Sequence, residues 1–332
     1  MGMTATCRAH PNIALVKYWG RRPGSPPELN LPATGSFSMT MGGVHTTTTV
    51  SVEPTGADVV LIDGKPAERR AYDRVVAHLD RMRASAKSQP HLRVVSQNNF
   101  PQGSGLASSA SAFAALTVAA NEVLGLGLSG REMSVVARQG SGSAARSLFG
   151  GWVLWNAGSA SEGSYADQIE PPSHLPVVDL VALVSRAHKK VGSGEGHGLA
   201  DTSPLHAARV ASVAPVLDEM LAALARKDLA RMGELAERDA LAMHGVMMTS
   251  SPSLLYWEPG TVEILHAVRA WRAEGLRCWF TIDAGPNVHV LCHGDDAPRV
   301  QAKMRALGYE GDRLLACPPG PGPTLLREHL SG

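Results

Sequence analysis

Alternation of apolar and polar residues predicts strands in the first third of the chain. Residues 36–41 carry this pattern. Residues 46–52 are rich in Thr and Val, residues 59–62 form a short apolar run, and residues 91–96 are a further candidate strand. Residues 71–83 instead have apolar side chains at helical spacing, with Val75, Val76, Leu79 and Met82 on one stripe. Strands and a helix are therefore mixed from the start.

The rest of the chain continues this mixture. A Gly/Ser turn opens into an Ala-rich helix over residues 106–124, and residues 131–138 predict a helix and 150–155 a strand. The Gly-, Ser- and Pro-rich stretch 156–176 is expected to be a linker or long loop. Beyond it we expect strands at 177–185, 278–282 and 288–292, and helices at 205–225, 228–244, 262–274 and 297–307. Pro215 is expected to kink or split the first of these four helices. The pattern predicts an α+β architecture with two lobes.

Composition narrows the function classes. The chain has 332 residues, 44% of them hydrophobic, with 31 Lys and Arg against 30 Asp and Glu. A net charge of +1 argues against a nucleic-acid partner, so any bound anion needs a local site. No apolar run approaches the roughly 20 residues of a membrane span, and no signal peptide is recognisable. Four scattered cysteines suit no disulfide framework, so we expect a cytoplasmic protein without a membrane partner.

The Gly/Ser turn at residues 98–112 is a candidate phosphate site. Gly103 and Gly105 allow close approach of the backbone to a ligand, and the following helix start presents free N–H groups to an anion. Ser104, Ser108 and Ser109 add hydroxyl groups. A small-residue helix start that packs closely against a neighbour is the alternative. The turn lacks the Gly-Lys-Ser/Thr ending of a Walker A loop.

Two further Gly/Ser segments carry cations. Residues 140–147 include Arg146, whose planar guanidinium suits phosphate or carboxylate, although a solvated surface arginine is the alternative. Residues 189–196 pair two lysines with a Gly/Ser segment, which could equally be a mobile solvated loop. Three such segments in a neutral chain favour an enzyme of phosphorylated small molecules.

Two charged residues interrupt apolar strands. Asp283 ends a strand beside a Gly-Pro turn, where it could act as a general base or simply bond its own backbone. Lys17 lies in the apolar segment 12–21, read as a strand, and needs an anionic partner unless it is exposed at an edge. His289, Cys292 and His293 cluster, but their spacing matches no standard zinc pattern.

Together these segments resemble one family, the diphosphomevalonate decarboxylases of the GHMP kinase superfamily. Residues 12–20 (NIALVKYWG) resemble its N-terminal signature, and NFP at 99–101 with GLASSA at 105–110 its phosphate loop. Residues 140–151 and the segment DAGPN at 283–287 resemble two later motifs, and the residues around 189–196 a further loop. The resemblance covers nearly the whole chain in family order.

The resemblance implies a fold and a reaction. The fold would be the GHMP kinase one, with a ribosomal-S5-like N-terminal lobe (1–180) and a ferredoxin-like C-terminal lobe (181–332). The enzyme would use ATP and Mg²⁺ to phosphorylate the C3 hydroxyl of (R)-5-diphosphomevalonate. Loss of that phosphate with CO₂ would give isopentenyl diphosphate. A homodimer is also implied.

The resemblance assigns roles to particular residues. Asp283, Arg146 and Lys17 would be catalytic, with Asp283 acting on the C3 hydroxyl and Arg146 holding the carboxylate. The substrate would be bound by Tyr18, Arg21, Ser141, Ser143 and Ser193. ATP would be bound by Asn99, Gly103, Ser104, Gly105, Leu106, Ala107, Ser108 and Ser109, and Mg²⁺ by Ser109.

The chain departs from the family pattern near the expected substrate tail. Arg21 stands where a lysine is usual, residues 31–36 read LPATGS in place of LPxNSS, and His197 stands where methionine is frequent. These changes leave open a decarboxylase of a monophosphorylated mevalonate. A 3-kinase that does not decarboxylate is a further hypothesis, and the presence of both Asp283 and Arg146 weighs against it. A non-catalytic binding protein would be expected to lack the base or the phosphate loop, and both are present.

Overall fold

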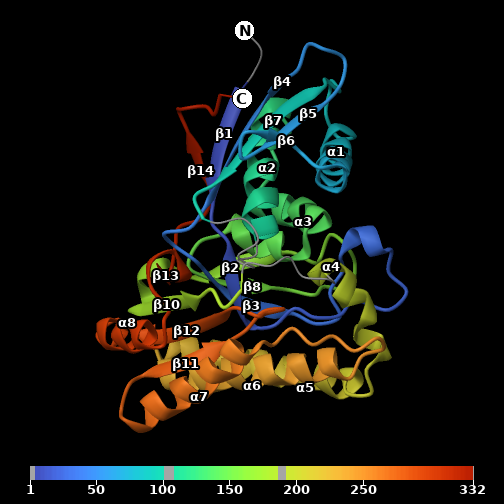
Figure 1. The fold of residues 1–332 in the computed structure, drawn as a ribbon. Helices are drawn as coiled ribbons and strands as arrows, with labels where there is room; N and C mark the ends of the chain where they lie inside the picture. Colours follow the sequence, from blue (N-terminus) through green and yellow to red (C-terminus); the bar gives the residue numbers. More distant parts are fainter. Residues whose placement is uncertain (1–3, 101–107, 186–191, 332) are drawn as a thin grey trace.

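The computed structural model describes residues 4–100, 108–185 and 192–331. Its N-terminal part is built on a six-stranded sheet (Figure 1). The strand order is β14 (Thr324–Leu326), β1 (Thr4–Ala9), β4 (Thr46–Val52), β7 (Leu92–Asn98), β5 (Val59–Ile62) and β6 (Lys65–Pro66). The β5–β7 pair is parallel and the other pairs are antiparallel. The expected strands at 46–52 and 59–62 are confirmed with the same bounds.

Three helices share an apolar cluster with this sheet. They are α1 (Arg69–Arg83), α2 (Ser108–Leu124) and α3 (Gly130–Gly140). Helix α2 lies directly on β1, β4 and β7. The Ala-rich α2 lets Phe113 and its neighbours pack closely against Val50, Leu79 and Val94 in one apolar cluster. Close helix–sheet packing thus fixes the start of α2, where the phosphate turn was predicted.

A second sheet has the order β2 (Asn12–Val16), β3 (Ser36–Thr40), β8 (Trp152–Trp155) and β9 (Ala166–Glu170). The expectation of a linker or loop over residues 156–176 is wrong in its second half. Strand β9 pairs with β8, and a 3-10 turn, η3 (Pro172–His174), follows it. The strand expected over 12–21 ends at Val16, before Lys17.

The third sheet has the order β11 (Cys278–Thr281), β12 (Val288–His293), β10 (Val177–Ala182) and β13 (Leu314–Cys317). Helices α7 (Pro259–Ala273) and α8 (Ala297–Ala306) pack on one face. The opposite face meets α5 (His206–Ala225) and α6 (Leu229–Met248). Pro215 does not split α5, which runs unbroken through it.

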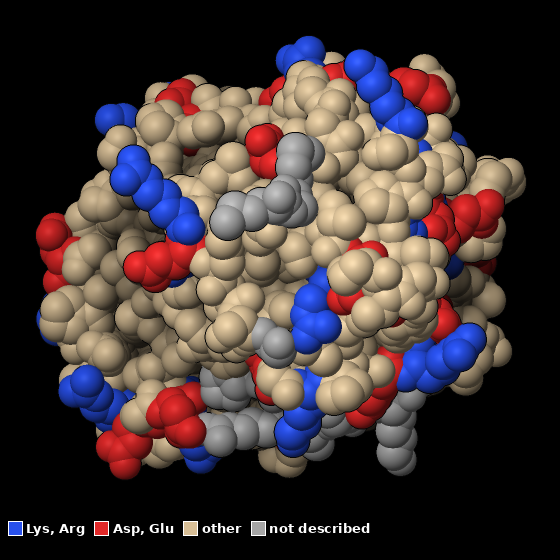
Figure 2. Space-filling model, turned by 90° about the horizontal axis from the view of Figure 1, so that it is seen from above, with Lys and Arg blue, Asp and Glu red and all other residues tan. Residues whose placement is uncertain are grey.

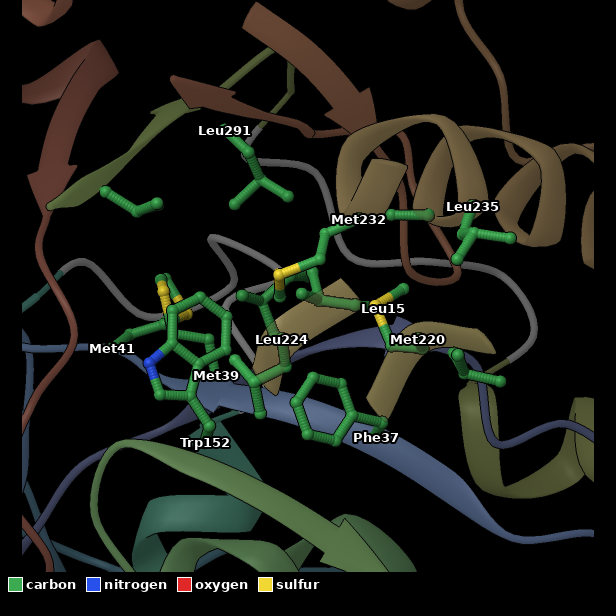
Figure 3. Packing of buried hydrophobic residues seen from close by; sticks show 14 of the residues in the cluster. Leu15, Phe37, Met39, Met41, Trp152, Met220, Leu224, Met232, Leu235 and Leu291 are labelled. Atoms are coloured by element: carbon green, nitrogen blue, oxygen red, sulfur yellow. The ribbon is translucent and has the colours of Figure 1, made fainter. Parts of the chain in front are cut away.

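The central core joins the second and third sheets. Figure 3 shows the side chains of Leu15, Phe37 and Trp152 gathered with Met232 and Leu291. Helix α6 packs against both β2 and β11. Burial of this apolar surface, at roughly 25 cal/mol per Å², holds segments near residues 15 and 290 together. The expected α+β architecture is confirmed.

The segment after β13 returns to the first sheet. Gly42 donates its N–H to the Pro318 carbonyl (2.6 Å), and Gly151 donates to the Gly320 carbonyl (2.9 Å). A Cβ built on Gly320 would lie 2.6 Å from the nitrogen of Gly42, so this crossing requires glycine. Strand β14 then pairs with β1. Figure 1 shows the first and last parts of the chain side by side.

Positive and negative side chains are interspersed on the face shown in Figure 2, without a broad patch of one sign. Among the described residues, no helix combines the length and hydropathy that a membrane crossing requires.

Candidate active site

Lys17 and Asp283 form a close ion pair. The Lys17 Nζ lies 2.7 Å from Asp283 Oδ1, although 266 residues separate them in sequence. Lys17 follows β2, and Asp283 lies in the turn between β11 and β12. The lysine side chain is 1% exposed, whereas a third of the Asp283 side chain is open. The anionic partner that Lys17 was expected to need is therefore Asp283, and Lys17 is not an exposed edge lysine.

The surroundings keep Asp283 ionised. Burial alone would raise its pKa, but Lys17, His289 and Arg146 hold the pKa of this carboxyl below its usual value. Burial lowers the pKa of Lys17, and the charge of Asp283 limits that drop. The carboxylate is thus available at neutral pH to accept a hydrogen bond or a proton.

Arg146 is a buried residue and not a solvated surface arginine. It is 3% exposed and lies in the 3-10 segment η2 (Gly142–Leu148). Its Nε donates to Asn12 Oδ1 (3.1 Å) and its Nη1 to Ser36 Oγ (2.6 Å). Burial lowers the pKa of Arg146 to about 10, so it remains cationic at neutral pH. No carboxylate among the described residues forms an ion pair with it, which leaves its charge available to an anionic ligand.

Tyr18, the residue after Lys17, lies in an aromatic stack. Its ring packs on His197 with centroids 4.0 Å apart and on the edge of Trp155 at 4.8 Å. Burial raises the pKa of Tyr18 to about 12, so the hydroxyl is a neutral donor. Gly142 must lack a side chain, because a Cβ there would lie 2.6 Å from the Tyr18 ring.

His197 and Arg21 connect this stack to residues 194–197. Gly20 donates its N–H to His197 Nδ1 (3.1 Å), which places the ring proton on Nε2. Burial, with the charges of Arg21 and Arg146, lowers the pKa of His197 to about 3 and keeps the ring neutral. Arg21 donates to the Gly194 carbonyl (2.8 Å).

Three predicted hydroxyl groups meet at the start of α2. Ser109 Oγ lies 3.1 Å from Ser141 Oγ, which lies 3.4 Å from Ser143 Oγ. Ser108 is exposed beside them at the first residue of the helix. Hydroxyl oxygens at a helix N-terminus suit phosphate and Mg²⁺. Among the described residues, no group of three or more His, Cys, Asp or Glu side chains is placed to hold a metal ion.

Other predicted residues contribute less to this geometry. Asn99 Nδ2 donates to the Gly43 carbonyl (2.9 Å), and Asn99 Oδ1 accepts from the His45 N–H (2.6 Å). Both ends of this amide thus bridge the backbone of a turn. Several predicted positions lie outside the described residues, namely Gly103, Ser104, Gly105, Leu106, Ala107 and the lysines at 189 and 190. Ser193 begins α4 (Ser193–Gly196).

Sequence reasoning missed the residues that hold the backbone of the Lys17–Asp283 pair. Asp239 and His244 on α6 and Arg209 on α5 are all buried and bond to the backbone of Lys17 or Asp283. A signal existed, because a charged Asp239 interrupts the apolar face of a predicted helix. His289, a neighbour of Cys292 and His293 in the sequence, bonds Asp179 through Nδ1 (2.7 Å).

The fold and this anion-receptive site define an enzyme of phosphorylated small molecules, and comparison with known proteins gives the family. Residues 9–166 match the model "Diphosphomevalonate decarboxylase-like N-terminal domain", and residues 179–312 the model "Mevalonate 5-diphosphate decarboxylase C-terminal domain". The chain is 38% identical to the diphosphomevalonate decarboxylase of Aspergillus fumigatus, over 92% of this chain and 82% of that protein. It is 34% identical to the phosphomevalonate decarboxylase of Haloferax volcanii, over 93% and 94%.

A solved structure of MDDEF in complex with MVAPP, AMPPCP and magnesium superposes with a TM-score of 0.92 and 36% identity, covering 98% of this chain and 99% of that chain. The chain belongs to the diphosphomevalonate decarboxylase family. Its GHMP kinase fold, expected from the sequence, is confirmed by this likeness.

Proposed function

We propose that the chain catalyses the ATP-dependent decarboxylation of (R)-5-diphosphomevalonate to isopentenyl diphosphate, ADP, phosphate and CO₂. The observation that carries the proposal is the pairing of an ionised Asp283 with a buried Lys17, beside a buried Arg146 that has no ion-pair partner among the described residues. Such a site supplies one base and several cations to an anionic substrate.

Asp283 is the group that acts on the C3 hydroxyl. Its carboxylate is ionised and a third exposed, so it can orient the hydroxyl and accept its proton. Lys17 holds Oδ1 of that carboxylate, which leaves Oδ2 for the substrate. ATP supplies the phosphoryl group and Mg²⁺ charge neutralisation, and Ser108, Ser109 and residues 103–107 are the proposed phosphate ligands.

Arg146 is proposed to hold the substrate carboxylate. Hydrogen bonds to Asn12 and Ser36 fix the plane of its guanidinium before the substrate binds. A rigid, buried cation stabilises the carboxylate without reorganisation, which is the condition under which electrostatic stabilisation is most effective. Departure of the C3 phosphate leaves positive character at C3, and CO₂ loss then supplies the electron pair of the new double bond.

The substrate's phosphate tail is proposed to lie against Tyr18, Arg21, Ser141, Ser143 and Ser193. Tyr18 and the serines offer hydroxyl donors, and Arg21 offers a charged fork. Asn99 is proposed to lie near the nucleotide base.

A monophosphorylated mevalonate is the second candidate substrate. Two observations favour it: Arg21 departs from the family pattern, and the Haloferax volcanii relative, at 34% identity, is a phosphomevalonate decarboxylase. Guanidinium and ammonium differ in reach and hydrogen-bond geometry, so the change falls where one phosphate is distinguished from two.

The deciding experiment measures CO₂, phosphate and ADP release with ATP and Mg²⁺. Mevalonate, 5-phosphomevalonate and 5-diphosphomevalonate are tested in parallel. A kcat/KM at least 100-fold higher for the diphosphate supports the main proposal, and the reverse ratio supports the monophosphate. ADP release without CO₂ would identify a 3-kinase instead.

In the same assay, Asp283→Ala should abolish turnover and leave ATP binding within a few-fold, and loss of ATP binding would make Asp283 structural.

The cellular setting is part of the proposal. We propose a cytoplasmic homodimer with lobes at residues 1–180 and 181–332. The cysteines are free and buried, which suits a reducing compartment, and the two matched segments, 9–166 and 179–312, support the division. Light scattering on the purified protein tests the dimer.

A further inference from the structure

Side chains, and not a neighbouring strand, hold the backbone of Lys17. Its N–H donates to Asp239 Oδ2 (2.6 Å), and its carbonyl accepts from Arg209 Nη2 (3.0 Å). Buried backbone groups need partners, and these two replace the sheet bonds that end with β2 at Val16. The position of Lys17 therefore depends on α5 and α6.

The two residues that hold Lys17 form a buried ion pair of their own. Arg209 Nη2 lies 3.1 and 3.2 Å from the two carboxylate oxygens of Asp239, and the side chains are 2% and 5% exposed. Arg209 Nε and Nη1 have no hydrogen-bond partner within the described part of the chain. Apolar residues of similar volume, placed where a buried ion pair stands, often stabilise a fold as well as the ion pair does. Stability alone does not account for this pair.

The same helix also holds Asp283. His244 Nε2 donates to the Asp283 carbonyl (2.8 Å). The residue is buried, and its ring packs against Trp257. His244 lies five residues after Asp239 on α6, about 7.5 Å further along the helix axis. One rigid helix thus binds the backbone at both members of the Lys17–Asp283 pair.

We propose that Asp239 and His244 are positioning residues for the reaction, acting through α6 to set the Lys17–Asp283 geometry. The inference rests on the proposed function. Helix α6 packs against β2, which precedes Lys17, and against β11, which precedes Asp283. A displacement of about 1 Å at a reacting group can cost about 100-fold in rate, so bonds this far from the substrate affect turnover.

The test compares disruptive and conservative variants. We expect Asp239→Ala and His244→Leu to lower kcat about 10- to 100-fold, with KM for ATP and for the mevalonate phosphate within about threefold. His244→Gln keeps an N–H near the position of Nε2 and should recover most of the rate. Asp218→Ala on α5 and His266→Leu on α7, both exposed, are the matched controls and should keep wild-type kcat.

Several outcomes would overturn the inference. These are an unchanged kcat in a folded disruptive variant, a rise in KM alone, and a His244→Gln variant as slow as His244→Leu. If Asp239→Ala does not fold, Asp239→Asn decides in its place, because it retains an acceptor for the Lys17 N–H but loses the charge facing Arg209. For Asp239→Asn, a kcat within about threefold of wild type supports the inference, because the bond to the Lys17 N–H is kept, and a loss of about tenfold or more overturns it.

A crystal structure of His244→Leu separates this inference from the proposed function. It reads the Lys17 Nζ–Asp283 Oδ1 distance whether or not the wild-type protein turns over. We expect that contact to lengthen beyond hydrogen-bond range. Retention of the 2.7 Å contact would overturn the positioning role even if the proposed reaction is correct.

Discussion

Replacing Lys17 by methionine removes the ammonium group and keeps most of the side-chain volume. At 2.7 Å, two unit charges interact by about 6 kcal/mol at an effective dielectric of about 20, and by about 1.5 kcal/mol in water. Because a third of Asp283 is open to solvent, we take the lower figure. Even this value changes the equilibrium between neutral and ionised Asp283 about tenfold.

Removal of Lys17 should raise the pKa of Asp283, because the charge of the lysine lowers that pKa. Lys17 is the largest contribution that lowers the pKa of Asp283, and burial opposes it. Without the lysine, burial prevails and the pKa rises, so a higher pH is needed for the same ionised fraction. The acid limb of kcat/KM should move to higher pH in Lys17→Met.

The assay is CO₂ release between about pH 3 and about pH 8 at constant ionic strength, with thermal melting at each pH to confirm the fold. Lys303→Met on α8 is the matched control, because Lys303 pairs only with the surface residue Glu274 in the described structure. An acid limb that stays in place while the rate falls would refute the reasoning. Lys17 would then act on a ligand, not on the ionisation of Asp283.

Three further predictions concern other buried groups. Arg146→Lys keeps the charge but loses the guanidinium fork, so kcat should fall about 100-fold with ATP affinity within threefold, measured by steady-state kinetics and calorimetry. Gly142→Ala places a methyl group against the Tyr18 ring and should raise KM for the mevalonate phosphate about tenfold, while an unchanged KM would place the substrate elsewhere. Burial lowers the pKa of His78 from 6.5 to about 3, so below pH 6.5 the unfolded chain takes up a proton that the folded chain does not. His78 should therefore contribute about 2 kcal/mol to the loss of stability from pH 8 to pH 5, and the loss measured by urea unfolding should be smaller by about this amount in His78→Gln than in wild type.

Part of the fold and site was predictable because the signals are local. The strand at 46–52 follows from its Thr and Val content, and the strand at 59–62 from a short apolar run. A lysine in an apolar segment indicated a buried anionic partner for Lys17, and an Asp beside a Gly-Pro turn drew attention to Asp283. The family resemblance added the role of Arg146, whose burial no local pattern distinguished from solvent exposure.

The rest depends on contacts between distant residues. Strand β9 (Ala166–Glu170) escaped notice because its sequence, ADQIE, is largely polar and lies at a sheet edge. The α6 residues Asp239 and His244 were missed because their partners lie far away in sequence. Lys17 follows β2 of the second sheet, and Asp283 follows β11 of the third. Helical periodicity shows which face is buried, but not which backbone group that face will meet.

The pairing of β14 with β1 affects the order in which the protein can fold during synthesis. Cys7 and Leu325 are register partners in the first sheet, so β1 lacks this neighbour until residues 324–326 leave the ribosome. The first sheet thus keeps an open edge throughout translation of α5, α6 and the third sheet. An exposed strand edge is a template for unwanted pairing with other chains. The need for chaperones should therefore be greatest before β14 has been synthesised and has paired with β1.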